Sequence, residues 1–107
     1  MTAWLFLFLA GALEIVWALG LRHSDGFTRL WPSLGTLAAI ALSFMLLATS
    51  LKSIPFGTAY AVWTGIGAAG AVVIGIFLFD ESADPVRITC VILIVMGTIG
   101  LKLVTPG

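Results

Sequence analysis

Four long apolar runs, separated by short polar connections, limit what this chain can fold into. The runs cover roughly residues 2–21, 31–51, 57–79 and 86–104. Each has about 20 residues, enough for a helix to cross a hydrocarbon core of about 30 Å at about 1.5 Å per residue. The connections RHSDGFTRL, KSIPF and DESADPVR hold nearly all of the charged residues. The pattern predicts an all-α integral membrane protein with four transmembrane helices, in one domain over residues 1–107.

The composition agrees with a membrane protein and argues against other classes. Hydrophobic residues make up 61% of the chain and charged residues only 9%, whereas soluble domains have about 25% charged residues. A small soluble fold could not hide this much apolar surface. The formal net charge is zero, so we expect no nucleic-acid partner. The sequence offers no nucleophile–base pair and no metal-ligand cluster, so we expect neither an enzyme nor a metal or cofactor site.

Glu14 is the only acid or base that lies well inside an apolar run. A charge at the middle of a bilayer costs about 2.5–3.5 kcal/mol on insertion scales, so a functional site is the default interpretation. The alternative is a protonated carboxyl that hydrogen-bonds to a neighbouring helix. The acidic residue, with no basic region before it, also favours a retained first span over a signal peptide.

Other polar and aromatic side chains inside the runs accompany this carboxyl group. Trp17 follows Glu14 by one helical turn and has an indole N–H to donate. Ser43 lies near the middle of the second run, and Tyr60 and Trp63 lie early in the third. Each of them could be a packing residue. Together they supply hydrogen-bond donors and aromatic faces around one acid, which is what a cation-binding site requires.

Two short motifs have structural interpretations. The stretch GIGAAG, residues 65–70, matches G-x-G-x-x-G, but a dinucleotide site needs a preceding strand and a βαβ unit. Inside a membrane span, small residues instead allow close helix packing. Asp84, directly before Pro85, is a predicted N-cap of the last helix. Cys90, in the last apolar run, is expected to be a small buried residue.

The positive side chains are almost evenly divided between the two sides of the membrane. Four spans place both termini on one side, together with Lys52 and Lys102, while Arg22, Arg29 and Arg87 lie on the other. Membrane orientation follows the Lys and Arg asymmetry. The near balance predicts that the chain inserts in both orientations.

The expected depths of the polar residues favour a pair of chains that run in opposite directions. Glu14 lies just past the middle of its span, whereas Tyr60 and Trp63 lie towards the opposite side of theirs. In a parallel dimer these groups would differ in depth by about 10–15 Å. An antiparallel, dual-topology homodimer would bring them level, as inverted repeats do in larger transporters.

Two long segments resemble the small multidrug resistance family, and its guanidinium-exporter subtype in particular. They are GALEIVWALGLRHSDGFTRLWPS, residues 11–33, and KSIPFGTAYAVWTGIGAAGAVVIG, residues 52–75. Trp17 favours this subtype, because drug exporters of the family usually have a small residue there. The resemblance covers essentially the whole chain.

The resemblance implies an antiparallel, dual-topology homodimer in a bacterial inner membrane that exchanges protons for guanidinium compounds. Glu14 would be the shared binding site for proton and substrate, so that the two compete. Five further residues would line this site or hydrogen-bond to it: Gly11, Trp17, Ser43, Tyr60 and Trp63. Two alternatives remain open. One is an exporter of quaternary-ammonium and other drugs with the same fold; the other is a non-transporting assembly subunit in which Glu14 links helices.

Overall fold

A computed structural model describes residues 2–105, and over that range the chain forms four helices. They are α1 (Thr2–His23), α2 (Leu30–Ser50), α3 (Phe56–Leu78) and α4 (Pro85–Val104). All four are long and apolar enough to cross a membrane. The predicted all-α architecture is confirmed, and the predicted ends agree with the observed ones to within two residues.

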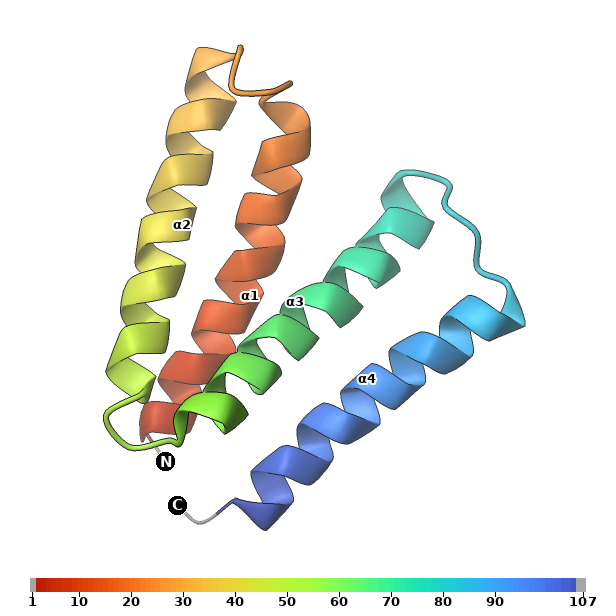
Figure 1. Ribbon diagram of the computed structural model, residues 1–107. Coiled ribbons are helices and arrows are strands. Elements are labelled where there is room, and N and C mark those ends of the chain that lie inside the picture. Colours follow the sequence, from red (N-terminus) through yellow and green to blue (C-terminus); the bar gives the residue numbers. More distant parts are fainter. Residues whose placement is uncertain (1, 106–107) are drawn as a thin grey trace.

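The helices do not form a closed bundle. Figure 1 shows α1 and α2 side by side along their length, while α3 begins beside the start of α1 and then diverges from it. Helix α4 lies along α3. Its last turn also reaches α1, where Nζ of Lys102 lies 4.9 Å from the centre of the Trp4 ring. The start of α1 and the end of α4 lie at the same end of the molecule (Figure 1), as four spans require.

The best-buried cluster lies where α1 and the first half of α3 cross. Its members are Trp4, Leu7, Ala10, Ile54, Ala59, Val62 and Trp63. Lipid tails are as apolar as these side chains, so the hydrophobic effect does not drive the helices together. Close van der Waals packing holds them instead.

The glycines of the 65–70 segment allow that close packing. A Cβ at Gly65 would press on the Thr98 side chain of α4, and a Cβ at Gly70 would press on the Ile15 side chain of α1. The prediction that this segment serves helix packing is therefore confirmed.

Helix α4 differs from the other three because none of its residues is buried. The prediction that Cys90 is buried was wrong, since its side chain is exposed. The reason is that the backbone of α4 approaches only that of α3 within the described part of this chain. The predicted N-cap is confirmed: the backbone N–H of Arg87 donates to Oδ1 of Asp84 at 2.9 Å, and Pro85 occupies the first turn.

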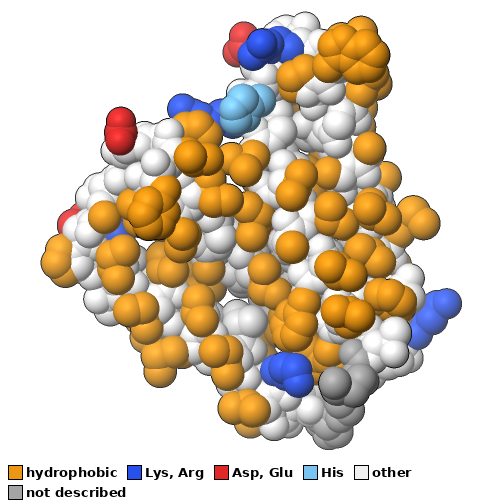
Figure 2. All heavy atoms as spheres, turned by 180° about the vertical axis from the view of Figure 1, so that it is seen from behind, with side chains coloured by type: hydrophobic (Ala, Val, Ile, Leu, Met, Phe, Trp, Pro, Cys, Tyr) orange, Lys and Arg blue, Asp and Glu red, His pale blue; other side chains and the backbone are white. Residues whose placement is uncertain are grey.

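The surface matches a chain surrounded by lipid. In Figure 2, hydrophobic side chains cover a broad band and the charged side chains lie towards the two ends. Large apolar residues are widely exposed, among them Trp31, Phe77 and Leu103. Soluble monomers rarely expose such extensive apolar surface.

Candidate functional site

The carboxyl group of Glu14 lies against α3 at Gly67. Gly67 is buried, and a Cβ at this position would overlap the Glu14 carboxyl. The missing side chain therefore provides the space that the acid occupies. Sequence reasoning gave Gly67 no role in the site, although its position one turn after Trp63, on the same face of α3, was a usable signal.

Two buried polar atoms on α1 have no hydrogen-bond partner among residues 2–105. They are Oε1 of Glu14 and Nε1 of Trp17. Because most buried polar atoms in proteins are paired, such exceptions call for an explanation, and a ligand is one. Trp17 follows Glu14 by one turn of α1, so an acceptor and a donor are both available on neighbouring positions of one helix.

Ser43 joins three helices through one hydroxyl group. Its Oγ donates to the backbone carbonyl of Ala10 at 2.7 Å and accepts from Nε1 of Trp63 at 3.0 Å. The Ser43 side chain is fully buried. In this arrangement the hydroxyl orients Trp63, one turn from the Glu14–Gly67 contact. A direct hydrogen bond from Ser43 to Glu14 stays a prediction.

A row of aromatic rings leads away from Ser43 along α3. The Trp63 ring lies 5.5 Å from that of Phe44 in an edge-on arrangement and 5.7 Å from that of Tyr60. Tyr60 in turn stacks on Phe56 with ring centroids 6.0 Å apart. Tyr60 is 51% exposed, so much of its surface is open to whatever lies beside this protomer. The row offers ring faces to a cation.

Gly11 brings α1 and α3 together. A Cβ at Gly11 would meet the side chain of Ile66 at 2.8 Å. Within one protomer Ile66 therefore fills the space beside Gly11, and the observed contact of Gly11 is helix packing. A role of Gly11 in lining the Glu14 site stays a prediction.

The register between α1 and α3 changes the predicted depths. Because Glu14 is level with Gly67, Trp63 lies only about 6 Å, and Tyr60 about 10 Å, from that level towards the start of α3. The predicted difference in depth of about 10–15 Å between Glu14 and the two aromatic residues was counted from the ends of the predicted spans. The span ends do not determine at which residues α1 and α3 contact each other. Trp63 is thus closer to the Glu14 of its own chain than predicted.

A comparison with protein families now adds to this geometry. The family model described as Small Multidrug Resistance protein matches residues 2–94, which include α1, α2 and α3. The chain belongs to the small multidrug resistance family. The resemblance noted from the sequence is confirmed, and the apolar helices and the family together identify a multi-pass membrane protein.

Curated relatives within the family carry a more specific name. A protein of Escherichia coli (strain K12) named Guanidinium exporter is 56% identical over 103 residues, which are 96% of this chain and 98% of the relative. Proteins of the same name from Citrobacter freundii and Salmonella typhimurium are 54% identical over 103 residues, with the same coverage. The matched region contains the Glu14 site and the aromatic row.

Proposed function

We propose that this protein is a transporter that exports guanidinium and small substituted guanidines across a bacterial inner membrane in exchange for protons. The observation that carries the proposal is the buried Oε1 of Glu14, which has no partner among the described residues and lies inside a membrane-spanning helix. The relatives named Guanidinium exporter support the choice of cation.

The chemistry of Glu14 matches a guanidinium ion. Such an ion is planar and donates two parallel N–H···O bonds to one carboxylate. Like the arginine side chain, it keeps its charge at any physiological pH, so it needs a negative partner in the membrane. Because the indole N–H of Trp63 is already bound to Ser43, Trp63 would interact with the cation through its ring face.

Competition at Glu14 couples the two ions. An empty carboxylate in the membrane is costly, and either a proton or a cation removes its charge. The same oxygen atoms bind one or the other, but not both. If only the loaded protein reorients, each proton that enters down its gradient allows a cation to leave.

The transporter we propose is an antiparallel homodimer with two Glu14 carboxyl groups. The balance of Lys and Arg between the two membrane sides supports it. Two exposed features also support the homodimer: α4 buries no residue within this chain, and Tyr60 is exposed. The two acids would titrate as a coupled pair.

Exchange in proteoliposomes tests the central role of Glu14. A guanidinium gradient should drive proton movement with the wild-type protein and fail to do so with Glu14→Gln, which keeps the shape but not the charge. Asp25→Asn, a loop acid that loses the same charge, is the control and should exchange normally. Coupled exchange that persists in Glu14→Gln would contradict the proposal.

Two measurements separate the alternatives. Guanidinium should drive exchange better than a bulky aromatic cation such as tetraphenylphosphonium, and the reverse order would indicate a drug exporter. Adding guanidinium to the detergent-solubilised protein should release protons, whereas an assembly subunit would release none.

The native cysteine tests the orientation of the two chains. Cys90 lies in the first half of α4, so two antiparallel α4 helices centred in the membrane would hold their Cys90 residues about 14 Å apart in depth. A disulfide needs Cα atoms within about 7 Å. Oxidation should therefore leave Cys90 unlinked, whereas Val95→Cys in a Cys90→Ser background, close to the midpoint, should crosslink. Efficient linkage through Cys90 would indicate a parallel dimer.

A further inference from the structure

A cavity of about 120 Å³ opens between α1 and α3 on the side of Glu14 that faces the α3–α4 connection. It begins at Ile15, the residue after Glu14, and ends at Arg22, Phe79 and Glu81. This stretch of α1 is about 10 Å long. The cavity therefore extends from the turn that carries Glu14 to the charged end of the molecule, and it has room for several water molecules or a small planar cation.

One wall of the cavity already binds a guanidinium group. The Cζ atom of Arg22 lies 3.9 Å from the centre of the Phe79 ring, within the range of a cation–π contact. Phe79 directly follows α3. The aromatic face at the end of this helix is thus occupied by the same chemical group that we propose as substrate.

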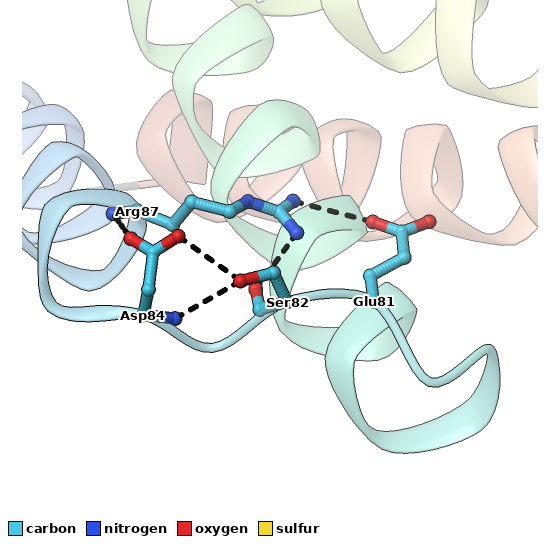
Figure 3. Close-up of polar contacts among 4 residues, drawn as sticks. All are labelled: Glu81, Ser82, Asp84 and Arg87. Carbon is cyan, nitrogen blue, oxygen red and sulfur yellow. Dashed lines mark hydrogen bonds and ion pairs between the residues drawn. The ribbon is translucent and has the colours of Figure 1, made fainter.

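The carboxylate of Glu81 completes the wall. Its Oε1 accepts from Nη2 of Arg87 at 3.2 Å, while its Oε2 has no hydrogen-bond partner in the described part of the chain. Figure 3 shows how Arg87 reaches across the connection from the Asp84 cap to Glu81. The carboxyl group also rests against Gly75, where a Cβ would press on it.

The two arginines of this wall are held differently. The side chains of Arg87 and Glu81 are 33% and 45% exposed, and exposed ion pairs contribute at most about 1 kcal/mol. Arg22 lies at the end of its helix and can extend into the headgroup region when it leaves the ring. Arg22 can therefore give way to a free cation. Arg87, which also donates from Nη1 to the Ser82 carbonyl at 2.8 Å, can stay in place while Oε2 of Glu81 accepts from that cation.

The charge on this side of the molecule also favours cations. Its connections contain four acidic residues and three arginines: Asp25, Asp80, Glu81 and Asp84 against Arg22, Arg29 and Arg87. The opposite side has Lys52 and Lys102 and no acidic residue. A surface with net negative charge concentrates cations next to it.

We propose that this cavity is a second, peripheral binding site for guanidinium-type cations, in which the cation stacks on Phe79 in place of Arg22 and binds the carboxylate of Glu81. The identity of the cation rests on the proposed function. Competition from Arg22 keeps the site weak, so that a bound cation can move on to Glu14 or leave.

Binding to a protein without the central carboxylate tests the site. In Glu14→Gln, guanidinium chloride titrated against sodium chloride at constant ionic strength should shift the NMR signals of the Phe79 ring saturably. Adding Glu81→Gln should abolish the shift. Adding Asp80→Asn, the neighbouring loop acid that does not line the cavity, should preserve it. Adding Arg22→Gln should make saturation occur at a lower concentration.

Three results would overturn the proposal. They are a Phe79 signal that does not respond, a response that survives Glu81→Gln, and an equal loss with Asp80→Asn, which would indicate only general surface charge. Because these titrations use Glu14→Gln, they report the peripheral site even if wild-type exchange were to fail. If the proposed function were wrong, the wild-type protein would show no coupled exchange, but the binding titrations could still succeed.

Transport by the otherwise wild-type protein gives a second readout. Glu81→Gln should raise the KM for guanidinium about two- to fivefold, which is the change in affinity expected when an exposed ion pair is lost. The effect on kcat should be smaller. Gly75→Ala should have a similar effect without any change of charge, because the added Cβ displaces the Glu81 carboxyl. A KM unchanged in both variants would contradict a role of the site in transport.

Discussion

The contact between α1 and α3 and the exposed helix α4 are opposite extremes within one small chain. Between α1 and α3, glycines bring the backbones close and leave space for a carboxyl group, and the buried cluster lies beside it. Helix α4 has no buried residue and lies along α3, with one side-chain contact from Lys102 to Trp4 of α1 near its end. Since helices in lipid are held by close contact rather than by the hydrophobic effect, single-atom changes should matter at the first region far more than at the second. The binding site that we propose is in the closely packed region, and the exposed helix is the surface that we propose for a second copy.

The largest difference is expected between two glycine substitutions. Gly67→Ala places a Cβ where the Glu14 carboxyl lies, whereas a Cβ at Gly97 of α4 meets nothing within 4 Å. A displacement of about 1 Å at a reacting group can cost about 10²-fold in rate. We therefore expect Gly67→Ala to lower guanidinium–proton exchange in proteoliposomes by about 10²-fold.

Gly97→Ala is the matched control for that experiment. Its monomer fold should be unchanged, and exchange by the properly inserted protein should fall far less than with Gly67→Ala. Equal losses would contradict the view that α1 and α3 hold the critical contact. A loss in Gly97→Ala accompanied by dissociation of the dimer would show that Gly97 itself lies in the contact between the two copies.

A smaller difference is expected between two hydroxyl groups. Ser43→Ala leaves the Ala10 carbonyl and the Trp63 indole without their buried partner, which should lower the free energy of unfolding by about 1–2 kcal/mol. Thr89→Ala in α4 removes only a hydrogen bond to the Pro85 carbonyl of its own helix, at an exposed position. Unfolding in mixed detergent micelles should show almost no change for Thr89→Ala, and equal effects would contradict the proposed difference.

The sequence was sufficient for features that depend on one helix at a time. Span positions follow from apolar length, and the Asp84 cap follows from a carboxylate placed just before Pro85. Glu14 stands out because a charge in lipid is expensive. None of these predictions requires knowledge of how one helix lies against another.

The features that were missed all depend on the register between helices. The role of Gly67 exists because α3 places it level with Glu14, and the partners of Ser43 depend on how α1, α2 and α3 meet. Cys90 was predicted to be buried on the average behaviour of cysteine, but its exposure is set by which face of α4 has a neighbour. Spacing along one chain does not determine these relations.

The smallest expected effect is a pH dependence confined to the first turn of α4. The hydrogen bond from the Arg87 backbone N–H, followed by that from the Ser82 hydroxyl, lowers the pKa of Asp84 below its ordinary value. The folded state thus favours the carboxylate, so the cap stabilises the helix end above the unfolded-state pKa of about 3.9. This contribution is lost as the pH falls through the lower pKa of the folded state.

Amide exchange of Arg87, corrected for its intrinsic pH dependence, should therefore lose protection in strongly acidic solution, while the amide of buried Val62 should not follow it. Asp84→Asn supplies an uncharged cap of similar preference and should remove the pH dependence. If the acid-induced loss at Arg87 persisted in Asp84→Asn, another group would be responsible. If Val62 lost protection in parallel, the end of α4 would be coupled to the packing of α1 and α3, and the separation between the two regions would not hold.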